Sequence, residues 1–347
     1  MINVGIAGIG FMGMIHYLSY QKVRGAKVSA ICEQDKKRLA GDWRSIQGNF
    51  GPRGTKMDLK GIARYERLDD LLADPGVGLI DVCLPPSLHA EVTIAALKAG
   101  KHVFCEKPIA LDAADARRMV ATARRTGRLL MVGHVLPFFP EYRFAYRAIT
   151  GGKYGRLLGG RFKRIISDPL WLPDFYNPRT IGGPMLDLHV HDAHFIRLVC
   201  GMPSKVETVG SMRGEVVERF DTQFRFDGPR PVVTASGGVI DQQGRPFTHA
   251  FEIYLERATL LFDFAVLGSE AVAAVPLTLL SEKGRVLRPK LGSGDPVDAF
   301  VAELKEVVRA VRTNVPSPLL AGELARDAVV LCQKQTQSVR LGRAVKV

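Results

Sequence analysis

Hydrophobic and polar positions follow two patterns along the chain, and the change falls near residue 135. In the first third, short apolar runs alternate with amphipathic stretches such as Ala113–Thr126. Apolar runs bounded by turn residues predict buried strands, and the amphipathic stretches predict helices. The predicted strands are Ile2–Ala7, Lys27–Cys32, Leu79–Leu84, His102–Cys105 and Leu129–Val132, with a second helix at Leu88–Ala99. This alternation predicts an α/β domain with a parallel sheet and helices on both faces.

Beyond residue 135 several prolines introduce a series of strand-like runs. The runs are Arg156–Ile166, Lys205–Gly210, Phe220–Phe226, Val232–Val239 and Phe247–Phe264. Strands that follow an α/β half predict an α+β domain with a large, mostly antiparallel open sheet. Helices are predicted at Val297–Thr313 and Gly322–Ser338. We expect three parts: residues 1–134, residues 135–310, and residues 311–347, a C-terminal helix and tail that pack back on the first part.

Length and charge exclude several classes of protein. The chain has 347 residues and a net charge of +13, with 46% hydrophobic and 24% charged residues. This length exceeds what one hydrophobic core usually fills, so two domains are expected. The apolar runs fall short of the roughly 20 residues that span a bilayer, and the N-terminus lacks the features of an export signal, so we expect a cytoplasmic protein without a membrane partner. The positive charge is spread over both halves, whereas nucleic-acid-binding proteins concentrate it on one face, so nucleic acid is not an expected partner.

A glycine-rich turn follows the first predicted strand and opens a helix. It comprises Gly8, Gly10 and Gly13, with Phe11 and Met12 between the last two. Glycines at these positions make the tight turn, let the backbone approach a pyrophosphate, and allow close packing of helix and strand. The phosphates would then lie at the positive end of the helix. We therefore interpret residues 1–134 as a Rossmann dinucleotide-binding domain.

The end of the second predicted strand indicates which dinucleotide is bound. Glu33 lies 20 residues beyond Gly13, where a carboxylate can accept both ribose hydroxyls of adenosine. Its charge would repel a 2′-phosphate, which favours NAD. Lys36, Lys37 and Arg38 follow closely and could reach such a phosphate, so NADP stays an alternative; they are otherwise solvated residues of a first helical turn.

Four further segments carry a family resemblance. Residues 81–89 read DVCLPPSLH, residues 96–108 read ALKAGKHVFCEKP, residues 182–191 read GGPMLDLHVH, and residues 338–345 read SVRLGRAV. In this order the segments resemble the Gfo/Idh/MocA oxidoreductases, the family of glucose–fructose oxidoreductase and inositol dehydrogenase. The resemblance touches nearly the whole chain.

The resemblance implies a role for the residues at the ends of two strands. Lys107, next to Glu106 in the EKP sequence, would contact both nicotinamide and substrate and stabilise alkoxide character as hydride leaves. A lone lysine is usually a surface residue, but this one directly follows a buried strand. Pro85 and Pro86 replace the family's Thr-Pro, which removes one hydroxyl and one backbone donor beside the cofactor. His89 would either lie near the nicotinamide or only begin a helix.

Asp187 and His191 form the second half of the predicted site. On a helix, residues four apart share one face and lie about 5–6 Å apart. His191 suits proton transfer near neutrality, and Asp187 would orient the imidazole or relay the proton. The competing interpretation is a structural contact between the two side chains. The sequence HVHDAH that begins at His189 also resembles a metal motif, but on a helix His189 and His191 would point about 200° apart, so no metal is expected.

The proline-rich connection before Gly182 holds candidate substrate residues. Trp171, Asp174, Tyr176 and Arg179 lie in it. Loops of this kind supply specificity on a rigid scaffold, although long loops also pack on their own side chains. Together with His191, Trp171 and Arg179 are the predicted substrate contacts.

The resemblance implies an NAD(P)-dependent dehydrogenase or reductase that interconverts a secondary alcohol and a ketone on a cyclic polyol, sugar or sugar derivative. Two alternatives stay open: relatives that recycle bound NAD to cleave glycosides or epimerise sugars, and regulators that bind dinucleotide without turnover. The presence of Lys107, Asp187 and His191 argues against the regulator. A homodimer or homotetramer is also expected, because a sheet with helices on one side leaves its other face to a partner subunit.

Overall fold

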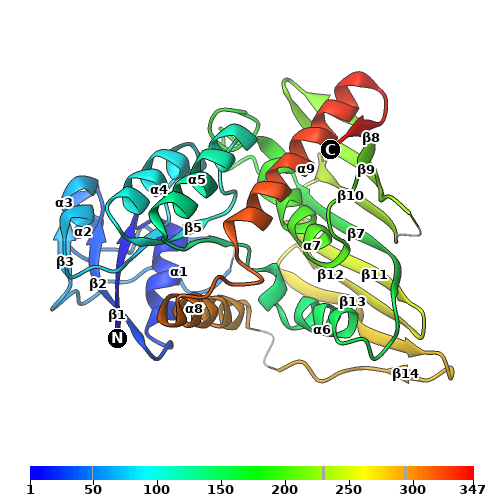
Figure 1. The fold of residues 1–347 in the computed structure, drawn as a ribbon, viewed down its shortest axis with the longest axis horizontal. Helices are drawn as coiled ribbons and strands as arrows, with labels where there is room; N and C mark the ends of the chain where they lie inside the picture. The colour runs from blue at the N-terminus through cyan, green and yellow to red at the C-terminus, as the bar shows by residue number, and fades with distance from the viewer. Residues whose placement is uncertain (49, 229–230, 293–294) are drawn as a thin grey trace. The chain divides into compact units, whose positions relative to one another are not determined.

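The chain divides into two compact units in the computed structural model, which describes residues 1–48, 50–228, 231–292 and 295–347 (Figure 1). Unit 1 comprises Met1–Phe139 and Gly294–Arg326, and unit 2 comprises Pro140–Ser293 and Asp327–Val347. Each unit contains its own sheet. Within the described residues, no helix combines the length and the apolarity needed to cross a membrane.

Unit 1 is built on a six-stranded parallel sheet in the order β3-β2-β1-β4-β5-β6, counted over the described residues. The strands are β1 (Ile2–Ala7), β2 (Ala26–Cys32), β3 (Ala63–Tyr65), β4 (Leu79–Val82), β5 (His102–Glu106) and β6 (Leu130–Gly133). The order reverses between β1 and β4. In open parallel sheets, ligands bind outside the carboxyl ends of the strands at such a reversal.

Helices accompany these strands, and three of the described helices of unit 1 begin at an aspartate whose side chain caps the first turn. They are α1 (Phe11–Tyr20), α2 (Lys36–Leu39), α3 (Leu68–Ala73), α4 (His89–Lys98), α5 (Ala113–Thr126) and α8 (Pro296–Thr313), with 3₁₀ turns at Pro86–Leu88 and Leu136–Phe138. At α5 the Asp112 carboxylate accepts the N–H groups of Ala114 and Asp115, and Gly127 ends the helix with φ +66°. Both are features that sequence can predict, since Asp favours N-caps and glycine favours left-handed C-caps.

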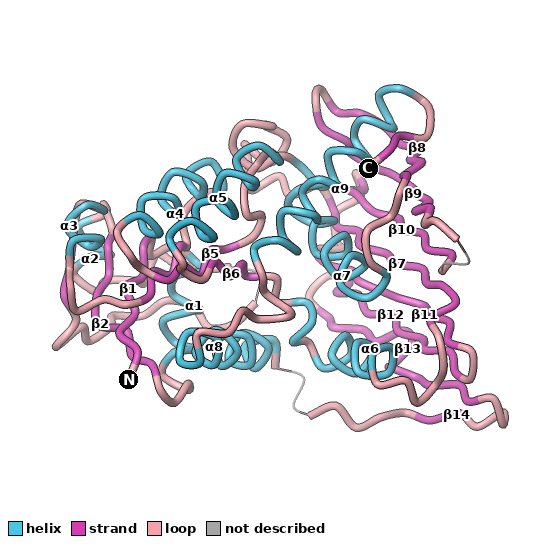
Figure 2. Tube along the Cα trace, in the orientation of Figure 1, coloured by secondary structure: helices cyan, strands magenta, loops and turns pink. Residues whose placement is uncertain are grey.

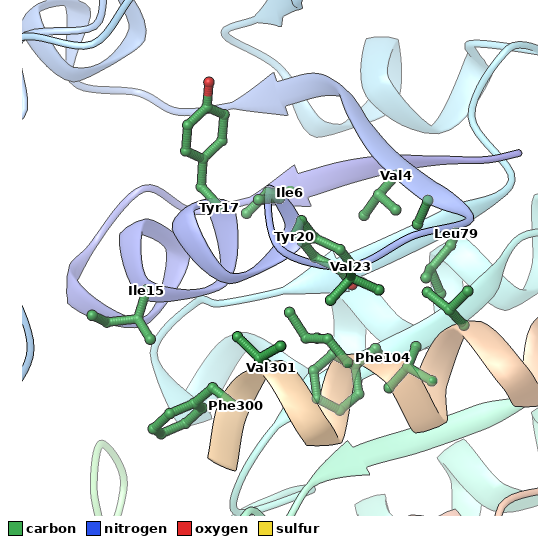
Figure 3. Close-up of a cluster of buried hydrophobic side chains, with 14 of the residues drawn as sticks. Val4, Ile6, Ile15, Tyr17, Tyr20, Val23, Leu79, Phe104, Phe300 and Val301 are labelled. Carbon is green, nitrogen blue, oxygen red and sulfur yellow. The ribbon is translucent and has the colours of Figure 1, made fainter. Parts of the chain in front are cut away.

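One apolar core joins the sheet of unit 1 to α1 and α8 (Figure 3). Val4 of β1, Leu79 of β4 and Phe104 of β5 are fully buried, and Phe300 and Val301 of α8 pack in the same cluster. Burying a side chain of this size contributes about 1.5–3 kcal/mol. This core explains why α8 belongs to unit 1, whereas the predicted division placed most of it with residues 135–310.

Unit 2 contains a nine-stranded sheet, again counted over the described residues, in the order β14-β13-β12-β11-β7-β10-β9-β8-β15. The strands are β7 (Leu157–Ser167), β8 (Lys205–Arg213), β9 (Val216–Arg225), β10 (Val232–Ile240), β11 (Phe247–Leu255), β12 (Ala258–Leu267), β13 (Glu270–Ser281), β14 (Val286–Leu287) and β15 (Val345–Lys346). Among the described strands of this sheet, β7 and β10 pair in parallel, and the other neighbouring strands pair antiparallel. This confirms the predicted, mostly antiparallel sheet.

Helices of unit 2 cover a face of that sheet (Figure 2). They are α6 (Pro140–Thr150), α7 (Val190–Cys200), which follows a π-helical turn at Met185–His189, and the part of α9 (Gly322–Leu341) from Asp327 onward. Tyr142 of α6 is fully buried, and its ring centroid lies 5.1 Å from Phe195 of α7 and 5.0 Å from Phe251 of β11. Edge-to-face aromatic packing thus fixes both helices on the sheet.

The structure adds three details to the predicted pattern. The run Phe247–Phe264 is a hairpin, because Glu256 and Arg257 form a turn between β11 and β12. The sequence prediction missed β13, whose first half is largely exposed and therefore lacks an alternation of apolar and polar residues. The predicted tail after residue 311 also differs, since β15 pairs with β8 of unit 2.

Candidate functional site

The glycine turn of unit 1 lies between β1 and α1. Gly8 has φ +94°, and a Cβ added there would lie 2.7 Å from the carbonyl oxygen of Cys83. A Cβ at Gly13 would lie 2.1 Å from the carbonyl oxygen of Gly8. The fold itself therefore requires glycine at both positions. At Gly10, the N-cap of α1, an added Cβ would meet nothing within 4 Å, which leaves open space where the first-turn amides of a helix attract an anion.

Glu33 holds this glycine turn from the end of β2. Its Oε2 accepts the N–H of Ile9 at 2.8 Å, and its Oε1 accepts the N–H of Asp35 at 2.9 Å. The contact with Ile9 is absent from the sequence prediction, which gave Glu33 only the ribose hydroxyls. A carboxylate oxygen accepts more than one hydrogen bond, so the two roles are compatible. Glu33, the predicted ribose contact, thus also fixes the shape of the glycine turn.

Arg38 reaches the same turn from α2. Asp35 caps that helix by accepting the N–H groups of Lys37 and Arg38, and the Arg38 guanidinium donates to the carbonyl oxygen of Ile9 at 3.4 Å. A carboxylate and a guanidinium therefore flank the glycine turn together. Of the three basic residues at 36–38, Arg38 is the one whose contact with the turn the structure records.

The segments after β4 and β5 are tied together by His89. Its imidazole is buried, with Nδ1 2.7 Å from the carbonyl oxygen of Pro108 and Nε2 2.8 Å from that of Leu84. Burial lowers the pKa of His89. Pro85 is the N-cap of the 3₁₀ turn and Pro86 begins it. The geometry supports the structural alternative for His89, and its contact with a cofactor stays a prediction.

Glu106 and Lys107 lie at the carboxyl end of β5. Glu106 is 6% exposed, and its Oε2 accepts the backbone N–H of Lys107 at 3.1 Å. Lys107 is half-buried and is followed by a cis peptide bond to Pro108. The predicted pair thus shares a hydrogen bond at the ligand-binding edge of the sheet, beside the reversal between β1 and β4.

Behind Glu106 lies a buried cluster that the sequence prediction missed. His16 of α1 places Nδ1 3.0 Å from Oδ2 of Asp81 in β4, and Nε2 3.1 Å from Oε1 of Glu106. Cys83 Sγ lies 3.3 Å from the same Nδ1. A signal existed in the sequence, because Asp81 interrupts the otherwise apolar strand Leu79–Val82, and a buried strand carboxylate needs a partner.

In unit 2, the segment Gly182–His191 is not one regular α-helix. Gly182 and Gly183 have φ +88° and +68°, and the π-helical turn Met185–His189 precedes α7. Asp187 lies in the π-helical turn and His191 in the second position of α7, and both are half-buried. The expected uniform i,i+4 geometry is therefore wrong in detail. Single π-helical turns within helices are frequent at functional sites.

A buried ion pair anchors the beginning of α7. Asp192, next to His191, accepts two hydrogen bonds from Arg164 of β7, at 2.7 Å to Oδ2 and 3.0 Å to Oδ1. The two side chains are 4% and 1% exposed. Such a paired guanidinium and carboxylate fixes geometry as well as charge. This pair holds the backbone on the C-terminal side of His191.

His189 has a different environment from His191. It is buried, and its Nε2 lies 3.1 Å from Oε1 of Gln335. The Nε2 amide group of Gln335 donates to the Thr222 hydroxyl oxygen at 2.8 Å. Burial lowers the pKa of His189 to about 4, so the ring is neutral near pH 7. His189 therefore packs in the interior of unit 2.

Asp168, Tyr176 and Arg213 form a cluster that holds the predicted substrate loop of unit 2. Tyr176 donates to Asp168 at 2.9 Å, and Arg213 donates to the same carboxylate at 2.6 Å. The Arg213 guanidinium also lies 4.0 Å from the centre of the Tyr176 ring. Trp171 is 75% exposed; Asp174 and Arg179 are exposed as well. Tyr176 thus packs the loop, while Trp171 and Arg179 remain predicted substrate contacts.

Comparison with known families matches both halves of the chain. Residues 2–134 match the model described as "Oxidoreductase family, NAD-binding Rossmann fold", and residues 142–261 match "GFO/IDH/MocA C-terminal domain". Both models describe one family, and together they span most of the chain.

Characterised relatives cover the chain to different extents. Myo-inositol 2-dehydrogenase of Thermotoga maritima is 28% identical, over 100% of this chain and 98% of its own length. The 1,5-anhydro-D-fructose reductase of Ensifer adhaerens is 35% identical over 53% of this chain and 55% of its own length.

Solved structures share the fold. Levoglucosan dehydrogenase in complex with NADH and levoglucosan has a TM-score of 0.78 and 21% identity, covering 100% of this chain and 99% of its own. A probable dehydrogenase from Thermotoga maritima has a TM-score of 0.79 and 24% identity, covering 99% of this chain and 98% of its own.

Proposed function

The chain belongs to the GFO/IDH/MocA oxidoreductase family, and from that premise we propose that it is an NAD-dependent dehydrogenase of a secondary alcohol on a cyclic polyol, sugar or sugar derivative. One observation carries the proposal: Gly10 faces open space at the N-terminus of α1, while the fold itself demands Gly8 and Gly13. Because the packing of the protein does not require glycine at position 10, the absence of a side chain there suits the close approach of a pyrophosphate. The match of myo-inositol 2-dehydrogenase over the whole chain supports the substrate class.

The residues of unit 1 fit an NAD cofactor. The turn Gly8–Gly13, including Phe11 and Met12, would hold the pyrophosphate against the first-turn amides of α1. Glu33 would accept the adenosine ribose hydroxyls with its remaining lone pairs. Pro85, Pro86 and Glu106 would border the nicotinamide end. When bound, the nicotinamide ring supplies the hydride acceptor of the reaction.

The chain's own side chains would handle the proton and the developing charge. Lys107 would hold the reacting hydroxyl and stabilise its alkoxide character. His191 would accept the hydroxyl proton, and Asp187 would orient the imidazole or pass the proton on. Trp171 and Arg179 would contact the rest of the substrate.

Calorimetry with NADH and NADPH on nucleotide-free protein tests cofactor choice. Glu33→Ala should weaken NADH binding by about 10–100-fold, because hydrogen bonds to a charged group contribute about 1.5–3 kcal/mol. NADPH binding should weaken less, since its 2′-phosphate gains from the loss of a negative charge. Lys60→Ala, an exposed change in the same unit outside the predicted cofactor residues, is the matched control. Equal losses for both cofactors would contradict the assignment, and tighter NADPH binding by the unmodified protein would move it to Arg38 and NADP.

Net redox chemistry is distinguished from cofactor recycling by counting NADH. Release of one NADH for each substrate molecule oxidised is the expected result. Product formed without net reduction of NAD would instead indicate the epimerase or glycosidase alternative. Binding of cofactor with no conversion of any polyol or sugar would indicate a regulator.

We also propose that the sheet of unit 2 mediates a homodimer or homotetramer. Leu158, Val209 and Val232 lie on its strands and are 47%, 68% and 67% exposed. Apolar side chains exposed on strands favour burial against a second copy. Light scattering should give a multiple of the 38.1 kDa chain mass, and a mass of one chain would contradict the proposal.

A further inference from the structure

His16 lies between two carboxylates in the interior of unit 1. It occupies α1 three residues after Gly13. Nδ1 is 3.0 Å from Asp81 Oδ2, and Nε2 is 3.1 Å from Glu106 Oε1. The side chains of His16 and Asp81 are fully buried and that of Glu106 is 8% exposed. One imidazole thus joins the helix of the glycine turn to the ends of β4 and β5.

This geometry determines the charge of the ring. Nδ1 of His16 hydrogen-bonds to Asp81, whereas Nε2 and Glu106 Oε1 lie 3.1 Å apart without forming a hydrogen bond. Two buried carboxylates this close to one ring favour its imidazolium form, because nearby opposite charge stabilises the charged form. Burial alone would lower the pKa of His16, but the charge of Asp81 and the hydrogen bonds to Asp81 and Cys83 raise this pKa well above its ordinary value.

The other groups around the ring are consistent with this charge. Cys83 Sγ lies 3.3 Å from Nδ1, and burial with the nearby charge of Asp81 raises the pKa of this thiol, which stays neutral. Glu303 of α8 is fully buried, and burial together with the charge of Glu106 raises its pKa well above its ordinary value. Burial likewise raises the pKa of the Tyr20 hydroxyl. Burial thus favours the uncharged forms of these three neighbours of the ring.

A continuous chain of contacts leads from this cation to Lys107. Glu106 contacts His16 through Oε1 and accepts the backbone N–H of Lys107 through Oε2. A Cβ added to Gly133 of β6 would lie 2.9 Å from that Oε1, so the neighbouring strand closely confines the carboxylate. The carboxylate is thus hydrogen-bonded at Oε2 and confined at Oε1 between His16 and β6, and the backbone of Lys107 is held with it.

We propose that His16 is a positioning residue: as a buried cation it holds Glu106, and through Glu106 it sets the position and the charge environment of Lys107. The importance of Lys107 rests on the proposed function, whereas the contacts themselves do not. Without the cation, Glu106 would turn or would expose an unbalanced negative charge to Lys107. An added negative charge stabilises the ammonium form of a lysine and raises its pKa.

Two measurements test the proposal without any substrate. Ring ¹⁵N chemical shifts should show both nitrogens of His16 protonated at pH 7, with His16→Gln identifying the resonance. Reductive methylation with ¹³C-formaldehyde should then show the amine pKa of Lys107 rising by about one unit in His16→Gln, with Lys107→Arg identifying that signal. His102→Gln, on the same strand as Glu106, is the matched control and should leave the Lys107 signal unchanged.

The results separate this proposal from the proposed function. A neutral His16 ring, or a Lys107 pKa that is the same in His16→Gln and wild type, would overturn the proposal even in an active enzyme. If His16→Gln does not fold, Glu106→Gln replaces it: the pKa of His16 should fall there, and an unchanged value would overturn the proposal. Failure of the wild-type protein to bind NADH would overturn the function while leaving both spectroscopic outcomes interpretable.

A kinetic readout follows once a substrate is identified. His16→Gln should lower kcat by about 10²-fold, the effect of a reacting group displaced by about 1 Å. The NADH dissociation constant should change little, because the contacts of the glycine turn remain. Parallel loss of NADH binding and turnover would contradict a role exercised through Lys107 and would indicate general damage to unit 1.

Discussion

The two units support their candidate reactive residues with different kinds of buried charge. In unit 1, Glu106 beside Lys107 is held by His16, whose charge depends on a proton. In unit 2, Asp192 beside His191 is held by Arg164, which stays charged at any pH a protein experiences. The side chain that holds a neighbour of a reactive residue in place can therefore carry either a charge that depends on pH or a permanent charge. We call these a titratable and a permanent support. We expect the stability of unit 1 to change with pH near and above neutrality. The Arg164–Asp192 ion pair that supports His191 should be unaffected by pH in this range.

Removal of the reactive side chains themselves has the largest expected effect. His191→Ala should lower kcat by about 10²–10⁴-fold, the usual range for loss of a general base. Lys107→Ala should remove most turnover while cofactor binding remains measurable. Steady-state kinetics on a verified substrate, with NADH titrations alongside, measure both. A rate near wild type in either variant would show that its residue is not reactive, and the comparison would then not apply to the unit that carries it.

Breaking the Arg164–Asp192 ion pair, the permanent support, should have the next largest effect, which is a loss of stability. Arg164→Met leaves Asp192 buried without its partner, which typically costs about 3–5 kcal/mol of unfolding free energy. The loss should be similar at pH 8 and pH 9, because arginine does not titrate in this range, and should decrease at lower pH, where the unpaired Asp192 can take up a proton. Urea unfolding followed by fluorescence measures it.

The exposed ion pair of Arg156 and Glu256 provides the control. Arg156→Met should cost no more than about 1 kcal/mol. Restoring stability with the double variant Arg164→Met, Asp192→Leu would show that the unpaired carboxylate causes the loss. A loss in Arg164→Met that changes strongly between pH 8 and pH 9 would contradict the distinction between the two supports.

The titratable support should show as a smaller, pH-dependent change in melting temperature. Glu303 has a raised pKa in the folded protein, so folding retains a proton that the unfolded chain releases above its pKa of about 4.3. Stability should therefore fall as the pH rises from there toward the folded pKa. His16 has the same sign: its contribution is complete below about pH 6.5 and is lost as the pH rises through its higher folded pKa.

Glu303→Gln removes one of these two losses. Its melting temperature should exceed that of wild type at pH 8 by about 2–4 °C, the effect of about 1 kcal/mol in a unit of this size. The gain should be smaller at pH 5, where the unfolded chain retains more of the proton. Glu66→Gln, an exposed change in the same unit, should shift neither value. The same gain at both pH values would show that Glu303 does not titrate on unfolding.

Local features of this fold could be predicted from the sequence, and long-range polar pairs could not. The apolar runs predicted β1, and the amphipathic stretch Ala113–Thr126 predicted α5 with the bounds that the structure has. Arg164 and Asp192 lie on elements whose alignment depends on the packing of Tyr142 and other aromatic rings, which no local pattern encodes.

The candidate site shows the same division between features that local sequence predicts and features that depend on long-range contacts. Motifs identified Lys107, Asp187 and His191, because short segments carry them. The π-helical turn at Asp187 and the second role of Glu33 toward Ile9 depend on how segments meet in three dimensions. A strand carboxylate such as Asp81 is the one sequence signal that pointed to a buried partner without naming it.

The two borders of the sheet in unit 2 have a consequence for how copies of the chain can associate. Both border strands, β14 and β15, contain only two residues. A border this short offers little backbone for another strand to extend, so growth of the sheet into an open-ended fibre is disfavoured. Copies that meet instead through the broad surface of the sheet bury that surface in each other and form a closed assembly. The architecture thus favours a finite oligomer over a polymer.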